Sequence, residues 1–509
     1  MRFTNCSFTG APTGTQSAGF FLEQTSIITN ATFENCQFTC RSTTDDTLEK
    51  RTAGFLMEDQ GTTISNAGFT NCTFSGKNTA LAWQRWQIQN GPADFPIVTN
   101  VLVKDCTMLS ASDRGISLHY LEGSNAVFHN VAIQGSPAVG IYADVNGNGF
   151  KFINVSYDGG GAAQGAYLAT SLNFESANWL MRGCSFTNLS GIGLHIRNAL
   201  KTSTFENLTL TGAAGSSHGI FVDDSLATTP SSKHVSTLTI RNSIISGFGG
   251  DGVRVNGNSH TIRDCTITGA GGHGVNLLDE STLRPVASLV QCVSNTITDC
   301  AGTGVVVEGQ THTIGYNTLL RNGEGIRVRN GILRTAGQAS NKSNTIIRNA
   351  IYGSSIPSGS GLWEARNPAI TNDPGPNTNT YLNNTVTDWA VGTEFRGFSN
   401  RIQNNIFFFN TVTNFRVLPS GLSALRAGWN CAPRVSGNQF DGIAIDYSKD
   451  IWYNPGFSSR TPGDPDFYFL GPLSPCRDRG TTNGLVADGH TDLGCIESGA
   501  SEVASWRRF

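Results

Sequence analysis

A short phrase that recurs four times between Thr237 and Gly331 constrains the fold of this chain more than any other feature. Each copy has a polar residue or a cysteine between apolar residues, then about nine residues of turn, and then Gly-Val or Gly-Ile opening an alternating strand. A unit this short cannot bury its own apolar face, so it must stack on copies of itself. The repeat therefore predicts a solenoid, which can absorb 509 residues as one repetitive body.

The first half of the phrase runs along most of the chain and defines about fifteen coils. Its central position is a cysteine in the N-terminal half and an asparagine later. We expect these side chains to form one inward column, with the cysteines as free thiols, because parallel Cβ vectors on adjacent coils suit a disulfide poorly. The predicted column contains Cys6, Cys36, Cys72, Cys106, Cys184, Cys265, Asn295, Asn317, Asn344, Asn384 and Asn404.

The second half of the phrase predicts which side chains face outward. Residues one and three positions after each strand-opening glycine are apolar or small, so with a period of two they face the core. Residues two and four positions after the glycine then form two outward columns. The first column reads Ser117, Tyr142, Tyr167, His195, Phe221, Arg254, Asn276, Val306 and Arg327, and the second reads His119, Asp144, Ala169, Arg197, Asp223, Asn256, Leu278, Glu308 and Arg329.

The stacking phrase, the asparagine column and the Gly-Ile strands resemble the right-handed parallel β-helix of the pectate-lyase-like superfamily over roughly residues 1 to 420. The end of the chain is similar to a closing segment of secreted bacterial β-helix proteins. The matching residues there are Ser474, Pro475, Asp478, Gly480, Asp492 and Gly494. The expected fold is all-β: a right-handed parallel β-helix over 1–425, followed by an irregular C-terminal capping segment over 426–509.

The resemblance implies a secreted or cell-surface protein that acts on an acidic or neutral polysaccharide. The first ten residues lack a secretory pattern and already read as a repeat, so we expect that a signal peptide and an N-terminal cap have been removed. A net charge of −3 and the lack of a long apolar run indicate neither a nucleic-acid partner nor a membrane span. Both a monomer and a homotrimer fit the sequence.

Two sequence features near the ends of the predicted β-helix carry alternatives. Trp83 and Trp86 lie in an apparent insertion over 77–100, where exposed indoles would bind sugar rings or, alternatively, fill the loop's own small core. Cys476 and Cys495 lie in the irregular end segment, where a disulfide between them would staple the C-terminal cap. No Cys/His spacing resembles a zinc site.

A row of titratable side chains on the outward columns marks the candidate active site, since a merely solvated face normally carries Thr, Ser, Asn and Lys. The predicted catalytic residues are Tyr167, His195, Arg197, Asp223, Asp224, Asp251 and Arg254. The predicted substrate-binding residues are Trp83, Trp86, His119, Tyr142, Asp144, His218, Asn256, His273, Glu308 and Arg327.

Two enzymatic mechanisms compete on this face. In a uronate-directed lyase, Tyr167 and His195 would be the acid and the base, and Arg197 and Arg254 would clamp the substrate carboxylate. In a glycoside hydrolase, two carboxyl groups must flank the bond at roughly 5 to 9.5 Å, as Asp223 or Asp224 with Asp251 would on adjacent coils. The excess of Arg and His over carboxylates favours the lyase slightly, because those residues suit an anionic sugar chain.

A non-catalytic adhesin or carbohydrate-binding β-helix is the third hypothesis, since fold alone does not give function. Val306 and Leu278, which the pattern places outward, fit such a passive surface or one covered by a loop or by another subunit. Calcium is a candidate ligand for Asp144, Asp223, Asp224 and Asp251, because it prefers oxygen ligands.

Overall fold

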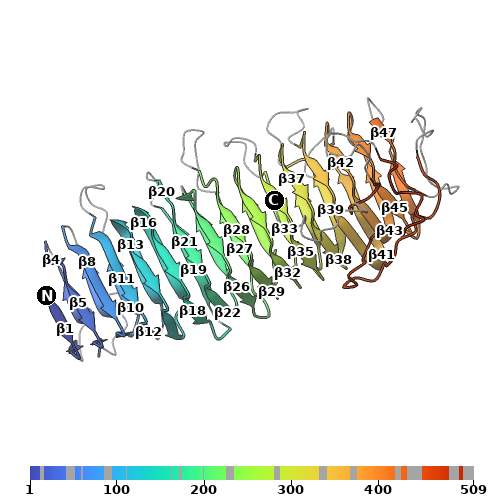
Figure 1. Ribbon diagram of the computed structural model, residues 1–509. Helices are drawn as coiled ribbons and strands as arrows, with labels where there is room; N and C mark the ends of the chain where they lie inside the picture. The colour runs from blue at the N-terminus through green and yellow to red at the C-terminus, as the bar shows by residue number, and fades with distance from the viewer. Residues whose placement is uncertain are drawn as a thin grey trace. The chain divides into compact units, whose positions relative to one another are not determined.

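The computed structural model divides the chain into two compact units, unit 1 (Met1–Gly250) and unit 2 (Asp251–Phe509). All elements among the described residues are β-strands, and no helix occurs among them (Figure 1). The structure describes residues 1–11, 17–23, 25–41, 52–58, 61–84, 95–110, 112–161, 163–170, 175–198, 200–224, 234–279, 287–331, 341–366, 375–418, 426–432, 450–480 and 492–496. Within this part of the chain no helix is long and apolar enough to cross a membrane.

Unit 1 is a parallel β-helix whose strands form three stacked faces. The first face contains β1 (Arg2–Thr4), β4 (Ile27–Thr29), β5 (Thr32–Glu34), β8 (Thr63–Thr70), β11 (Ile97–Lys104), β14 (Val127–His129), β17 (Lys151–Ile153), β21 (Leu180–Arg182), β25 (Thr204–Glu206) and β28 (Thr239–Arg241). The second contains β2 (Ser7–Thr9), β6 (Gln37–Thr39), β9 (Thr73–Gly76), β12 (Thr107–Ser110), β15 (Ala132–Gly135), β18 (Ser156–Asp158), β22 (Ser185–Leu189), β26 (Thr209–Gly212) and β29 (Ile244–Ser246). The third contains β3 (Ala18–Leu22), β7 (Ala53–Glu58), β10 (Thr79–Gln84), β13 (Arg114–Ser124), β16 (Val139–Asn148), β19 (Gln164–Ala169), β23 (Leu194–Arg197) and β27 (Ile220–Asp223), and β20 (Ser176–Ala177) pairs separately with β24 (Leu200–Lys201).

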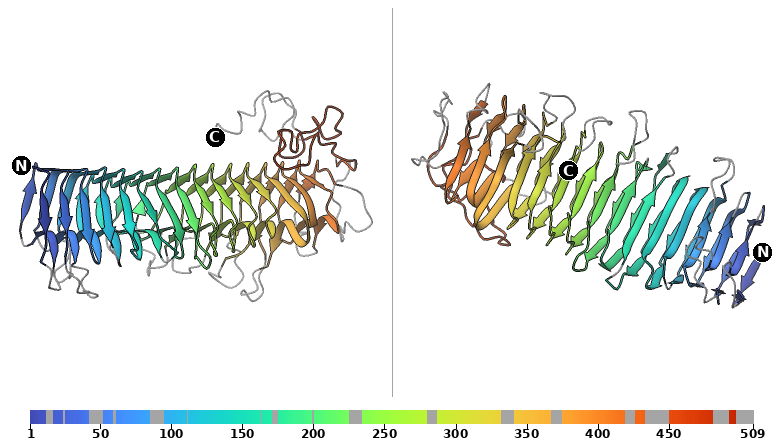
Figure 2. Two further views of the ribbon diagram at one scale, coloured as in Figure 1. Left: turned by 90° about the horizontal axis from the view of Figure 1, so that it is seen from below. Right: turned by 180° about the vertical axis from the view of Figure 1, so that it is seen from behind.

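Unit 2 repeats this plan, with successive strands of each face side by side (Figure 2). Its first face contains β31 (Thr261–Arg263), β34 (Gln291–Val293), β37 (Thr313–Gly315), β40 (Thr345–Ile347), β42 (Thr380–Leu382), β44 (Arg401–Gln403) and β47 (Arg426–Gly428). The second contains β32 (Thr266–Thr268), β35 (Thr296–Thr298), β38 (Thr318–Leu320), β45 (Ile406–Phe408) and the first parts of β41 (Ala350–Ala365) and β43 (Thr385–Phe395). The third contains β30 (Val253–Asn256), β33 (Val275–Leu278), β36 (Thr303–Val307), β39 (Glu324–Arg329), β46 (Thr413–Val417) and the last parts of β41 and β43.

The predicted β-helix and its in-register columns are confirmed. On the third face of unit 1, Tyr142 pairs with Tyr167, Tyr167 with His195, and His195 with Phe221. The alternating residues beside them, such as Ile196, are fully buried in the core. The period of two therefore sorts inward from outward side chains as the sequence indicates.

A residue in the left-handed conformation ends the first strand of each coil, directly before the column of stacked side chains. Asn35 (φ 55°) precedes Cys36, and Asn71 (φ 53°) precedes Cys72. Asparagine and aspartate tolerate this conformation better than other non-glycine residues, because their short side chains bond locally. The recurring Asn-Cys pair is thus a turn residue followed by a column residue.

Cysteine and asparagine occupy the column in equivalent ways. The thiols of Cys36, Cys72, Cys106 and Cys184 each reach a carbonyl oxygen of the coil before, as Cys72 Sγ does to Phe33 O at 3.5 Å. Each asparagine also donates there, as Asn317 Nδ2 does to Cys292 O at 2.9 Å, and its Oδ1 accepts from the backbone N of the previous column residue, Asn295, at 2.9 Å. The asparagine amide therefore bonds both a backbone C=O and a backbone N–H, whereas the thiol makes only weaker hydrogen bonds to these groups.

Two members of the predicted column were wrong. The residues in the ladder are Asn349 and Asn405, whose Oδ1 atoms accept from the backbone N of Asn317 (3.1 Å) and Asn384 (2.9 Å). Asn404 is the preceding turn residue, at φ 59°. Asn344 belongs to a second ladder, in which its Oδ1 accepts from His312 N at 2.8 Å. Two asparagine ladders in the same coils cannot be separated by composition alone.

The structure holds all twelve cysteines as thiols, as predicted for the column. The predicted disulfide between Cys476 and Cys495 was wrong, because the two side chains pack in different clusters. Cys476 packs in a cluster with Ile406 and Leu493. Cys495 packs in a different cluster, with Ala350 and Tyr468. Each thiol is buried by its own set of apolar neighbours, so the two do not meet.

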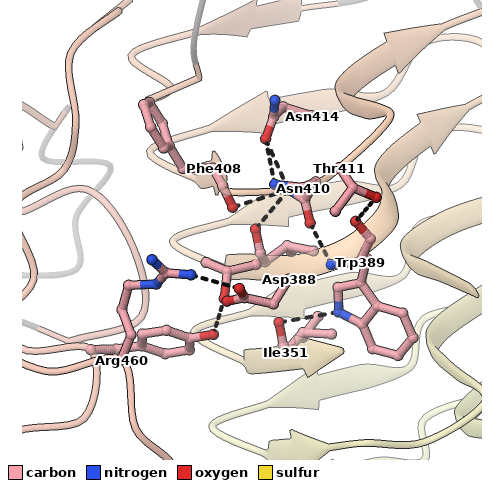
Figure 3. A network of polar contacts seen from close by, with 11 residues as sticks. Ile351, Asp388, Trp389, Phe408, Asn410, Thr411, Asn414 and Arg460 are labelled. Atoms are coloured by element: carbon pink, nitrogen blue, oxygen red, sulfur yellow. Dashed lines mark hydrogen bonds and ion pairs between the residues drawn. The ribbon is translucent and has the colours of Figure 1, made fainter. Parts of the chain in front are cut away.

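Residues 450–480 and 492–496 pack beside the second face of unit 2. Arg460 bonds Asp388 Oδ1 at 2.6 Å and lies 3.6 Å from the ring centre of Phe409, and Tyr468 bonds the Thr387 hydroxyl. Figure 3 shows Asp388 next to Trp389, whose backbone N donates to Asn410 Oδ1 at 3.0 Å. The final segment is thus attached through the β43 strand by both apolar and polar contacts.

We predict that Asn317→Ala lowers the free energy of unfolding by about 2 to 4 kcal/mol. The substitution removes the acceptor for Asn295 N and the donor to Cys292 O, so these buried backbone groups lose a hydrogen-bond partner. Asn317→Cys should recover part of this loss, since cysteine fills the same column in earlier coils. Urea unfolding followed by circular dichroism measures the effect. Thr318→Ala, at a half-buried position next in sequence, is the matched control and should change stability by less than about 1 kcal/mol. Equal stabilities of Asn317→Ala and the wild type would contradict the structural role of the ladder.

Candidate functional site

Four adjacent strands on the third face of unit 1, β16, β19, β23 and β27, carry the candidate site. A glycine opens each strand at a tight corner: a Cβ on Gly165 would clash with the carbonyl oxygen of Gly193 in the next coil. This close approach fixes the register of β19 against β23 and so aligns the side chains that follow.

The first outward column is a continuous ladder of rings. Tyr142 and Tyr167 stack at 4.9 Å between ring centres with an interplanar angle of 8°. Tyr167 meets His195 edge to face at 5.3 Å and 88°, and His195 stacks on Phe221 at 5.1 Å. The rings cover one another's faces, so they present edges, hydroxyl groups and ring nitrogens outward. Such a ladder can bind a ligand through polar groups on a stiff support.

Arg197 links the two outward columns. Its Nε lies 3.0 Å from Asp223 Oδ2 on the next strand, and its guanidinium lies close enough to the Tyr167 hydroxyl on the previous strand to lower the pKa of that phenol. His195 Nε2 lies 3.5 Å from the same Asp223 oxygen. Burial raises the pKa of Tyr167 more than Arg197 lowers it, so this phenol keeps its proton at neutral pH.

Asp144 is the second carboxyl group of this face and is only 9% exposed. Burial raises its pKa to about 6, against the opposing effects of Arg114 and Arg197. Among the described residues its Oδ1 has no hydrogen-bond partner. A buried carboxyl group with a free oxygen and a pKa near neutrality is typical of groups that exchange protons or bind ligands.

Two further residues of this surface were missed by the sequence analysis. Arg114 places its guanidinium 3.6 Å from the ring centre of Tyr142 and donates to Ser117 Oγ at 3.0 Å. Tyr120 lies in a bulge of β13, with φ 50°, where the register shifts between His119 and Leu121. Arg114 stands before the glycine and so outside both predicted columns, and no residue type signals the bulge.

The bulge brings Tyr120 onto His119, with 3.9 Å between the ring centres. Burial, reinforced by the charge of Arg114, lowers the pKa of His119 to about 3, so its ring is neutral. Burial raises the pKa of Tyr120, with smaller contributions from Asp144 and Tyr167. The structure therefore brings His119, Tyr142, Asp144, Tyr167, His195, Arg197 and Asp223 together on one face.

Several predicted residues do not join this group. Asp224 is buried and bound to His234 Nδ1 at 2.8 Å, which makes it part of the chain's own packing. Trp83 is not an exposed platform: it lies on the inner side of β10, fully buried against Phe128. The reason is that residues 79–84 form a regular strand in place of an insertion. Trp86 lies outside the described residues, and His218 packs beside Phe221 at 5.4 Å.

The predicted residues of unit 2 form local polar pairs. Asp251 accepts from His273 N at 2.8 Å and from Asn276 Nδ2 at 2.9 Å. Glu308 pairs with Arg329 at 2.7 Å. The other predicted residues of this unit are Arg254, which is half-buried, Asn256, which is buried, and Arg327, which bonds Glu324 at 2.9 Å.

Val306 and Leu278 are 0% and 4% exposed, which contradicts the passive exposed surface and confirms the alternative that these outward positions are covered, here within the chain itself. No group of three or more His, Cys, Asp or Glu side chains that could hold a metal occurs in the described part of the chain. In unit 1 the cause is visible: Asp223 is paired with Arg197, and Asp224 with His234.

Comparison with known proteins places this chain among β-helices. The family model described as a right-handed β-helix region matches residues 1–171, 120–286 and 229–407. No curated protein sequence matches the chain significantly.

Three solved structures illustrate what the chain resembles. The A-module of a mannuronan C-5 epimerase from Azotobacter vinelandii is 12% identical, with 77% of this chain and 91% of that chain covered and a TM-score of 0.42. The pectate lyase Pel9A is 12% identical, with coverage of 86% and 88% and a TM-score of 0.31. A PL6 family polysaccharide lyase from Pseudopedobacter saltans is 14% identical, with coverage of 79% and 90% and a TM-score of 0.34. Identities this low do not identify a reaction, so the chemistry must come from the residues of this chain.

We predict that Asp144 makes the protein less stable as the pH rises. A carboxyl group whose pKa is about 6 when folded and 3.8 when unfolded binds more protons in the folded state between those values. Its contribution is fully present below about pH 4 and is lost as the pH rises through about 6, which amounts to at most about 3 kcal/mol. Urea unfolding of the wild type and Asp144→Asn from pH 4 to 8 should show that the substitution removes this loss.

The matched control for this titration is Asp158→Asn. Asp158 is exposed, and a hydrogen bond from Asn188 lowers its pKa. Asp158→Asn should therefore still lose stability as the pH rises, as the wild type does. Parallel pH profiles of the wild type and Asp144→Asn would contradict the assignment of a raised pKa to Asp144.

Proposed function

Because the chain belongs to the family of proteins with a right-handed β-helix region, we propose that it is a polysaccharide-active enzyme that works on the third face of unit 1. The reaction we propose is β-elimination in a uronate-containing polysaccharide. The observation that carries this proposal is the edge-to-face contact of Tyr167 with His195, at 5.3 Å between ring centres, with Arg197 on the same strand as His195 and near enough to lower the pKa of Tyr167. A cation, a protonated phenol and an imidazole thus occupy two neighbouring strands.

These three groups match the three tasks of the elimination. The Arg197 guanidinium pairs with the uronate carboxylate and stabilises the negative charge that develops there. His195 takes the proton from the carbon next to that carboxylate, and Tyr167 gives its proton to the departing glycosidic oxygen. The C–O bond then breaks, a carbon–carbon double bond forms, and the chain is cleaved without water. Asp223 holds Arg197 and faces His195, so it positions both.

The carboxyl groups of the described face favour elimination over hydrolysis. Asp144 and Asp223 lie on β16 and β27, three strand steps apart, and therefore about 14 Å apart at the spacing of stacked strands. A hydrolase needs its two carboxyl groups within roughly 5 to 9.5 Å. Asp224, which the hydrolase hypothesis pairs with Asp251, is bound to His234. The two carboxyl groups compared on this face, Asp144 and Asp223, thus do not form the pair that a hydrolase needs.

A purely binding or structural role is less well supported. Such a surface would expose Thr, Ser and Asn, whereas this face gathers two tyrosines, a histidine, an arginine and two carboxyl groups. The proposal also implies that the protein meets its polymer outside the cell.

A screen against uronate-containing and neutral polysaccharides tests the function. Reducing ends and the ultraviolet absorbance of unsaturated uronyl products are followed together, and both should rise on a uronate polymer. Reducing ends without the absorbance would overturn the lyase in favour of a hydrolase. If neither signal rises but the polymer retards the protein in affinity electrophoresis, the protein binds the polysaccharide without cleaving it, and the enzymatic proposal is wrong.

We predict that Tyr167→Phe lowers kcat by about 10² to 10⁴ with little change in KM, because it removes the proton donor and keeps the stacked ring. The measurement is the initial rate of absorbance increase at several substrate concentrations. Tyr316→Phe, on a different face and in unit 2, is the matched control and should retain full activity. Wild-type kcat in Tyr167→Phe would remove this phenol from the mechanism.

A further inference from the structure

Cys431 lies directly after β47, in a fixed backbone position. Its N donates to Asn405 O at 2.8 Å, and its O accepts from Phe407 N at 2.8 Å. The side chain is fully buried, and its thiol donates to Tyr453 O at 3.3 Å. The residue thus belongs to the β-helix of unit 2 and cannot move far from its coil.

Cys476 approaches from the segment that packs beside the same coils. Its N donates to Ser474 Oγ at 3.1 Å, and its O accepts from Leu493 N at 3.0 Å. It too is fully buried, in a cluster that contains Cys431, Ile406 and Leu470. The two thiols are therefore neighbours in one cluster, close enough for Cys476 to raise the pKa of Cys431.

The geometry of this pair differs from that of the column cysteines. Cys72 and Cys106 are also neighbours, with Cys72 N bonded to Cys106 Sγ at 3.4 Å, but they sit at equivalent positions of adjacent parallel strands. Parallel Cβ vectors at strand spacing resist the dihedral angle that a disulfide requires. Cys431 follows the strand ladder, whereas Cys476 lies in a turn of the final segment, so the two do not hold equivalent positions on adjacent parallel strands and that restriction does not apply to them.

We propose that Cys431 and Cys476 form a disulfide that covalently attaches the C-terminal segment to the β-helix of unit 2. With glutathione disulfide as the oxidant, one thiolate attacks it and releases one glutathione, and the second thiol displaces the other glutathione from the mixed disulfide. Two protein thiols are oxidised, and one glutathione disulfide is reduced to two glutathione molecules. The inference is independent of the proposed catalytic activity, since it concerns residues of unit 2 alone.

The bond forms during folding and not in the finished protein. Both sulfur atoms are buried, and the neighbouring Cys476 thiol together with burial raises the pKa of Cys431, so little thiolate is exposed to an oxidant once the segment has docked. Reduced folded protein should therefore react slowly with glutathione disulfide. Refolding in a glutathione redox buffer should form the bond.

Counting thiols tests the proposal. The protein, unfolded, reduced and refolded with reduced and oxidised glutathione, is denatured and titrated with a thiol reagent. The count should fall from twelve to ten, because one disulfide removes two thiols. The thiol count of Cys495→Ser should fall from eleven to nine. The thiol counts of Cys431→Ser and Cys476→Ser should stay at eleven. Cys72→Ser should behave as Cys495→Ser does.

Peptide mapping of the wild type gives a test that does not depend on the variants folding. Trypsin without reduction should release residues 427–434 linked to residues 461–477, as a single species that reduction separates. A count of twelve after refolding, a link from Cys476 to Cys495, or a link between Cys72 and Cys106 in place of this pair would overturn the proposal.

Discussion

The stacked column of side chains at one corner of each coil is the interaction on which the rest of this structure depends. Each column residue follows a residue in the left-handed conformation, so the backbone turns sharply at the same place in every coil. The side chain then bonds to a carbonyl of the coil before, through a thiol early in the chain and an amide later. If one coil shifted by one residue against its neighbour, the asparagine amide would lose its backbone partners and the left-handed residue would leave the corner. The column therefore fixes the register of all three faces.

Fixed register decides what chemistry the third face can perform. Side chains at equivalent positions lie about 4.8 Å apart per strand step, so only groups on the same or neighbouring strands can act on one bond. Tyr167, His195 and Arg197 satisfy this condition, whereas Asp144 and Asp223 do not. The solenoid thus limits catalysis to short runs of its columns. The same reasoning explains why rings stack on this face: equivalent positions in parallel strands bring like side chains together.

Much of the fold was predictable because it depends on periodicity. The period of two within the strands placed Tyr142, Tyr167 and His195 on one face, and the repeat of the Asn-Cys pair indicated the stacking. The errors arose at positions that the periodicity of the sequence does not distinguish. Asn344 and Asn349 both fit an asparagine column, and only the hydrogen bonds separate the two ladders. Val306 faces outward by its position in the strand and yet is buried, because coverage by other segments leaves no mark in the strand pattern.

The same distinction applies to the candidate site. Tyr120 reaches it through a bulge, and Arg114 reaches it by folding its side chain back over Tyr142, so neither follows the column rule. Their effect is electrostatic: the charge of Arg114 opposes the raised pKa of Asp144 and adds to the lowered pKa of His119. A regular column supplies the framework for the reaction. Arg114 and Tyr120, which depart from the column rule, change the protonation behaviour of the column residues. A repetitive fold acquires a distinct chemical site at such positions.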